Sequence, residues 1–209
     1  MRARLLVPFF LAAVVGAQQP DPFARLDARS RYAIEAMIDS AGVQGLPADA
    51  LRSLALQGIQ KGAPSRVIVD AVRRLFGNLR EARAILGPVN NEDLKAAAGV
   101  LEITNVKPAV LAPFKDPPKG RSLATALTVL GDLLTRGVPR DDASSAVVGL
   151  WKDGAGEAEF TGLFRRVEGD ILRGLNPGAA LQNWMREYPG RGSPSKVNPP
   201  PESPDFPSS

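Results

Sequence analysis

One segment of this chain occurs twice, and this duplication constrains the fold more than any other feature. The first copy runs from Gly45 to Leu79 and the second from Gly137 to Ile171. The copies align without gaps at an offset of 92 residues. The chain is therefore expected to build two versions of one structural unit.

The two copies share residues whose types have structural or chemical meaning. The identities are Asp49 with Asp141, Gly62-Ala63 with Gly154-Ala155, Arg73-Arg74 with Arg165-Arg166, and Gly77 with Gly169. Apolar residues recur at the i, i+3, i+4, i+7 spacing of a helical face in both parts of each copy. The pattern predicts a helix, a tight turn and a second helix.

The turn and the helix starts follow from residue types at fixed places. Gly62 and Gly154 fall just past the first helix of each copy, where a left-handed residue lets the chain turn. Pro47 and Pro139 suit a first helical turn, where no N–H partner is lost. Each copy is therefore expected to form an α-hairpin.

A helix is also expected before each copy, so that each half of the chain holds about three helices. The halves span approximately residues 23–87 and 120–175, with a connector over 88–119 and a terminal helix over 177–188. No segment shows the sustained alternation of a half-buried strand. The predicted fold class is all-α, a single domain over 18–188 of about eight to nine helices in two pseudo-symmetric halves.

The first 17 residues have the pattern of a secretory signal peptide. Arg2 and Arg4 precede an apolar stretch that ends in small residues near Ala17. The uncharged stretch of about 13 residues is shorter than the roughly 20 that a spanning helix needs, so no transmembrane segment is expected in the mature chain. The protein is therefore predicted to be exported, to the periplasm or beyond, with cleavage near Ala17.

Composition limits the partners and the compartment. Cleavage would remove two of the four net positive charges, so charge alone gives little reason to expect nucleic acid as a partner. The chain has no cysteine and hence no disulfide. Seven of the 21 residues over 189–209 are proline and few are apolar, so this tail is predicted to be disordered.

The missing residue types exclude much of enzyme chemistry. The chain has no histidine, the commonest general base and metal ligand, and no thiol. No phosphate-binding glycine loop or nucleophile-elbow motif is present. No cofactor is therefore predicted, and the chain is not expected to be an enzyme.

Carboxylates leave one catalytic alternative open. A carboxylate-dependent hydrolase would need two acidic side chains facing one cleft. The candidates are Glu35, Glu92, Glu157 and Glu159. Most acidic pairs in this chain fall at predicted helix starts, where stabilising the helix dipole is a sufficient explanation.

The arginine pairs are the polar feature that recurs, and they are the candidate site. Pseudo-symmetry could bring Arg73, Arg74, Arg165 and Arg166 to one surface that binds a phosphate or an acidic glycan. The alternative is salt bridging along each helix, because Asp70 precedes Arg74 by four residues and Asp170 follows Arg166 by four.

These observations favour one function and leave a second open. The leading prediction is an exported, non-catalytic binding or scaffolding protein whose partner is a protein or an envelope component. The second is an envelope-associated structural or chaperone-like protein with an apolar groove between its halves.

Overall fold

The computed structural model describes residues 22–103, 106–118 and 120–188, and within these ranges the chain is helical without any strand. The all-α prediction is confirmed. The predicted signal peptide and the predicted disordered tail lie outside the described residues. None of the helices within the described ranges combines the length and the apolar character needed to cross a membrane.

The described part of the chain contains eight α-helices and one 3-10 helix. In chain order they are α1 (Ala28–Val43), α2 (Ala48–Gln60), α3 (Ser65–Leu86), α4 (Asn91–Glu102), η1 (Pro108–Phe114), α5 (Ala124–Thr135), α6 (Arg140–Lys152), α7 (Glu157–Leu172) and α8 (Pro177–Glu187).

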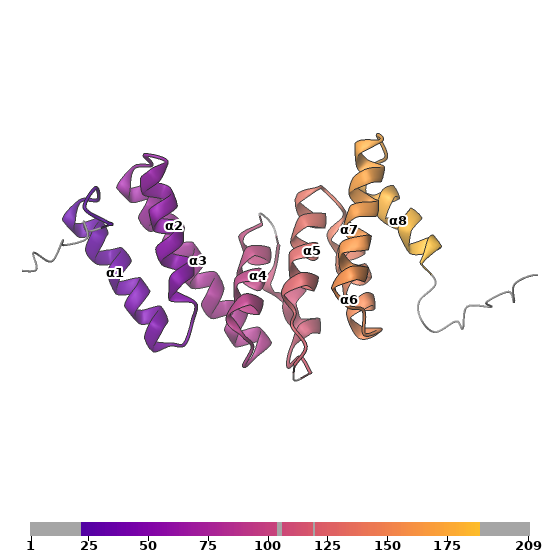
Figure 1. Cartoon of the computed structure of the whole chain (residues 1–209), viewed down its shortest axis with the longest axis horizontal. Helices are drawn as coiled ribbons and strands as arrows, with labels where there is room; N and C mark the ends of the chain where they lie inside the picture. Colours follow the sequence, from indigo (N-terminus) through magenta and orange to yellow (C-terminus); the bar gives the residue numbers. More distant parts are fainter. Residues whose placement is uncertain (1–21, 104–105, 119, 189–209) are drawn as a thin grey trace, which may run out of the picture.

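The helices form an elongated array in which neighbours in the sequence are neighbours in space. Figure 1 shows α1 at one end, α4 and α5 in the middle and α8 at the other end. The main contacts join α1 to α2 and α3, α3 to α4, α4 to α5, α5 to α6 and α7, and α8 to α6 and α7. The hydrophobic core is therefore continuous along the array rather than gathered at one centre.

The helix boundaries follow the duplication closely. Helices α2 and α6 each have 13 residues and start 92 positions apart, as do the starts of α3 and α7. Gly62 and Gly154 both have positive φ, at 68° and 79°, as the turn prediction requires. The relation of the two halves by a symmetry operation stays a prediction.

The halves differ where the second copy lacks the long helix of the first. Helix α3 continues for 22 residues to Leu86. Helix α7 ends at Leu172, Gly174 turns the chain at φ 96°, and Asn176 caps α8 by accepting a hydrogen bond from the N–H of Gly178 at 3.0 Å. The predicted terminal helix thus packs back on α7 and α6.

The first helix is shorter than its apolar pattern suggests. The first half is expected to begin near residue 23, but α1 begins at Ala28 because the Asp27 carboxylate caps it, accepting from the N–H of Ser30 at 2.9 Å. Phe23 and Leu26 are buried all the same, in the turn before the helix. These two residues are buried without being helical, and apolar spacing alone does not reveal this difference.

The connector between the halves is itself part of the core. It contains α4 and η1, and η1 packs on α3 and α6. The η1 residue Phe114 is fully buried, with its ring centroid 6.2 Å from that of Trp151. The Arg121 guanidinium lies over the Trp151 ring, 3.6 Å from its centroid. Trp151 is 6% exposed and serves packing.

Candidate functional site

The structure places the two predicted arginine pairs on separate helices. Arg73 and Arg74 lie on α3, Arg165 and Arg166 lie on α7, and all four side chains are exposed. Helices α4 and α5 come between α3 and α7 in the order of packing (Figure 1). Each pair therefore has its own set of neighbouring residues.

The α3 pair is held by two different carboxylates. Arg73 donates to Asp70 at 2.7 Å, and Arg66 reaches the same carboxylate at 3.9 Å. Arg74 instead contacts Glu102 of α4 at 3.2 Å. The expected pairing of Arg74 with Asp70 is wrong, because Asp70 is taken up by arginines one turn away on either side.

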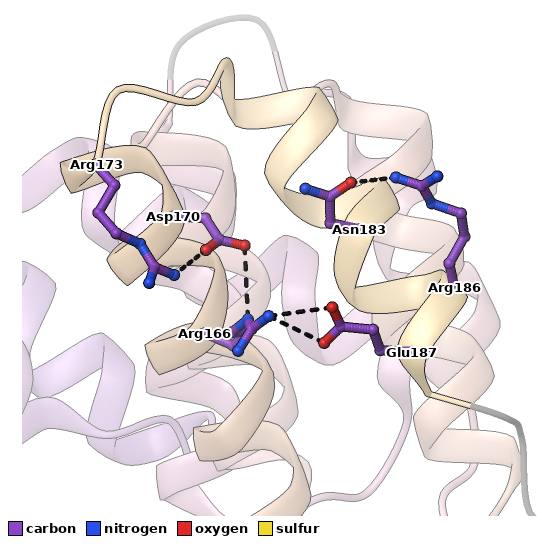
Figure 2. A network of polar contacts seen from close by, with 6 residues as sticks. All are labelled: Arg166, Asp170, Arg173, Asn183, Arg186 and Glu187. Carbon is purple, nitrogen blue, oxygen red and sulfur yellow. Dashed lines mark hydrogen bonds and ion pairs between the residues drawn. The ribbon is translucent and has the colours of Figure 1, made fainter.

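The two arginines of the α7 pair differ in their ion pairs. Arg166 lies between Asp170, at 3.6 Å, and Glu187 of α8, at 3.0 Å, as Figure 2 shows. Asp170 is 4% exposed and also accepts from Arg173. The predicted pairing of Arg166 with Asp170 is confirmed. Arg165 has no hydrogen bond or ion pair within the described part of the chain.

Helix α8 is attached to α7 by this network. The Glu187 carboxylate receives two hydrogen bonds from Arg166, at 3.1 and 3.0 Å. On the same helix, Arg186 donates to Asn183 (Figure 2). Arg166 thus links a buried carboxylate on one helix to an exposed carboxylate on the next, which is a structural role.

A hollow between α1 and α3 brings one predicted arginine together with two others. It has a volume of about 540 Å³ and is open to solvent. It is lined by Asp27, Arg29, Ser30, Ala33, Arg66, Val69, Asp70 and Arg73. We call this site the arginine hollow. Its charged lining has three guanidinium groups and two carboxylates, so it favours an anion.

The carboxylates of the arginine hollow are engaged before any ligand arrives. The backbone N–H of Ser30 lowers the pKa of Asp27 below its usual value, since that bond favours the ionised form. Asp70 is shared by Arg66 and Arg73. Within the described residues, Arg29 has no carboxylate at ion-pair distance, so its guanidinium is free to bind a ligand.

Two of these three arginines were missed by the sequence analysis of the site. The signal for Arg66 is its spacing from Arg73, since positions seven apart lie on one helical face. The signal for Arg29 is weaker, because its approach to α3 depends on how α1 packs. The signal in the sequence is that Arg29-Ser30 recurs as Arg121-Ser122 at the offset of the duplication.

Two further hollows flank α8. One, of about 150 Å³, lies between α6 and α8, and the other, of about 360 Å³, lies between α7 and α8. Trp184 and Tyr188 line both. We call Trp184, Met185 and Tyr188 together the aromatic shelf.

The four glutamates considered for hydrolysis lie on three helices. Glu35 is on α1, Glu92 on α4, and Glu157 and Glu159 on α7. The Glu159 carboxylate accepts from the N–H of Gly156 at 2.9 Å, which caps its own helix. Among the described residues, no group of three or more acidic side chains is arranged to hold a metal ion.

Comparisons with protein-family models, with curated proteins and with solved structures give no match for this chain.

Proposed function

We propose that this protein is an exported, non-catalytic binding module that uses the arginine hollow to hold an acidic group of a partner protein. An array in which helices pack side by side offers an extended surface, and such arrays serve as binding surfaces in helical repeat proteins. The array of Figure 1 supports this class of function.

The observation that carries the proposal is the meeting of three guanidinium groups from two helices around one hollow. Arg29 comes from α1, and Arg66 and Arg73 come from α3. Guanidinium groups bind carboxylates through paired N–H donors, which gives geometric selectivity as well as attraction. Arg29, which has no ion-pair partner in the part of the chain that the structure describes, provides such donors.

The acidic residues of the arginine hollow set its selectivity. Asp70 orients the Arg66 and Arg73 side chains, and the Asp27 carboxylate stabilises the start of α1. An incoming ligand has to place its charge near Arg29 and away from these two carboxylates. A partner segment with spaced acidic side chains fits better than a compact, highly charged ion.

The binding site is tested with a peptide in which five glutamates alternate with five glycines, added to isotopically labelled chain 18–209. The expected result is a set of chemical-shift changes centred on α1 and the first half of α3. Replacing Arg29, Arg66 and Arg73 by glutamine should abolish these changes.

The matched control removes three positive charges elsewhere, at Lys61, Arg140 and Lys152, which are exposed and lie outside the arginine hollow. This control should retain the binding. Equal weakening in both triple variants would show that net charge alone attracts the peptide and would contradict the proposal.

Export is proposed from the leader sequence and needs its own measurement. The expected result is a chain in the extracytoplasmic fraction whose N-terminus is near Gln18. A chain that stays in the cytoplasm and begins at Met1 would overturn the export part while leaving the arginine hollow to be judged separately.

A further inference from the structure

Helix α8 lies at the end of the array opposite α1 (Figure 1), and the hollow between it and α6 is lined mostly by aromatic and small apolar residues. The aromatic shelf lines one side, and the C-terminal half of α6 lines the other. The Trp184 and Tyr188 rings stack, with centroids 4.6 Å apart and planes 14° apart, and Met185 is 45% exposed. Gly149 contributes no side chain on the α6 side. The hollow therefore offers a ligand more aromatic and apolar contact than hydrogen bonding.

The charge of this hollow is negative. Among the described residues that line it, Asp153 is the one that carries a charge. The Asp153 carboxylate has no hydrogen bond or ion pair within the described part of the chain. Asp153 is also the C-cap of α6, where the helix dipole places partial negative charge. A cation bound in this hollow would compensate both the carboxylate and the end of the helix.

The hollow on the other side of α8 does not have this character. It is lined by Arg166 together with Glu159 and Glu187, and Arg166 already forms an ion pair with Glu187 at 3.0 Å. A positive ligand there would meet a guanidinium group. The hollow between α6 and α8 is therefore the better place for a cation.

The aromatic lining selects the kind of cation. A positive charge is attracted to the face of an aromatic ring, and quaternary ammonium groups are bound in this way. A primary ammonium is a compact, strongly hydrated charge whose N–H donors need acceptors. A quaternary ammonium has no N–H donor, and its methyl groups can contact Trp184, Met185 and Tyr188 directly. The lining therefore favours the methylated cation.

The size of the hollow agrees with such a group. Its volume is about 150 Å³, and a water molecule takes about 30 Å³ in the liquid, so the hollow has room for about five groups of that size. A trimethylammonium group with its first methylene has about that number of non-hydrogen atoms. We propose that the hollow between α6 and α8 binds a small, soluble quaternary ammonium compound of the choline class, with its methyl groups on the aromatic shelf and its charge near Asp153. This site is separate from the arginine hollow and does not depend on its function.

The test compares two ligands of one shape, choline and its neutral carbon analogue, in which a tert-butyl group replaces trimethylammonium. Each is titrated into isotopically labelled chain 18–209. The expected result with choline is a saturable shift of the Trp184 indole N–H and of the Gly149 and Asp153 amides, with α1 unaffected. The neutral analogue should bind about tenfold more weakly, because it keeps the apolar contacts and loses the charge. Equal binding of the two ligands would overturn the proposal.

Variants locate the charge and the rings. Asp153→Asn keeps the shape of an exposed side chain and should remove most of the preference for choline, whereas Trp184→Leu should weaken both ligands. The matched control is Asp141→Asn, which removes an exposed carboxylate at the other end of α6 and should bind choline as the wild type does. Equal choline affinity in wild type and Asp153→Asn would contradict the site.

A lipid head group is a second source of the same cation, and vesicles distinguish it. Phosphatidylcholine carries a phosphate close to its ammonium group, and this phosphate would be repelled by Asp153. Phosphatidylcholine vesicles should therefore not sediment the chain. Sedimentation that free choline abolishes would replace the soluble ligand with a membrane surface and overturn the proposal as stated.

Discussion

The Asp93 carboxylate of α4 accepts a hydrogen bond from the backbone N–H of Leu123, 2.7 Å away, just before α5 begins. The same carboxylate oxygen accepts from the Ser122 hydroxyl at 2.7 Å, and its other oxygen accepts from the Asn90 side chain at 2.9 Å. Asp93 is 2% exposed. One buried carboxylate thus joins the connector to the first helix of the second half.

Replacing Asp93 by alanine should lower the free energy of unfolding by about 2–3 kcal/mol, since a buried backbone N–H and a hydroxyl lose their acceptor. The measurement is urea denaturation followed by circular dichroism. Glu92→Ala is the control, because Glu92 is exposed and its ion pair with Lys95 contributes less than about 1 kcal/mol. Equal losses in the two variants would contradict this role for Asp93.

Replacing Arg121 by lysine should destabilise the fold by about 1 kcal/mol, because lysine keeps the charge but loses the planar contact with Trp151. It also loses the bond that Arg121 donates to the Ala155 carbonyl at 3.1 Å. Arg80→Lys is the matched control, since Arg80 lies 5.9 Å from the Phe76 ring centroid and is exposed. The measurement is the midpoint of thermal unfolding. A larger decrease for Arg80→Lys than for Arg121→Lys would contradict the stabilising role of Arg121.

The ion pair between Asp49 of α2 and Lys95 of α4, at 2.9 Å, should make stability depend on pH at both extremes. The hydrogen bond from Lys95 lowers the pKa of Asp49 below 3.8, and the bond to Asp49 raises the pKa of Lys95 above 10.5. The Asp49 contribution is lost as pH falls through its folded value, and the Lys95 contribution as pH rises through its own.

The measurement is the stability difference between wild type and Lys95→Met across pH. It should stay level through the neutral range and shrink below about pH 4 and above about pH 10.5. Because both side chains are partly exposed, it should not exceed about 1 kcal/mol. A difference that is the same at pH 3 and pH 7 would refute the assignment.

Asp132 of α5 should show the opposite dependence. Partial burial raises its pKa above 3.8, Arg136 opposes this rise, and Glu168 adds to it. The ionised form therefore destabilises the fold at neutral pH, and the penalty disappears as pH falls below the ordinary value. Asp132→Asn should stabilise the protein at pH 7 and have little effect near pH 3, by denaturant unfolding at both. A loss of stability at pH 7 would reverse this reasoning.

Local features of the fold were predictable because each depends on nearby residues. Gly62 and Gly154 marked the turns, and the terminal helix expected over 177–188 corresponds to α8. Such signals act over one or two helical turns, where backbone hydrogen bonding decides the conformation.

The candidate site was only partly predictable, since it depends on contacts between distant helices. Spacing along α7 gave Arg166 with Asp170, but it could not give Arg166 with Glu187, which lies 21 positions away on α8. Likewise, Asp70 could be assigned to α3 but not to a hollow shared with α1. Whether Asp70 pairs with Arg73 or with Arg74 depends on the directions of the side chains, which the sequence does not give.

The neighbour-to-neighbour packing of the array also has a kinetic consequence. Low separation between contacting segments favours rapid folding, because few long loops have to close before contacts form. The pairs α2–α3 and α5–α6 are each joined by a short turn and pack on each other, so either can nucleate without waiting for the other. Folding can then spread from both hairpins and meet where α4 packs on α5.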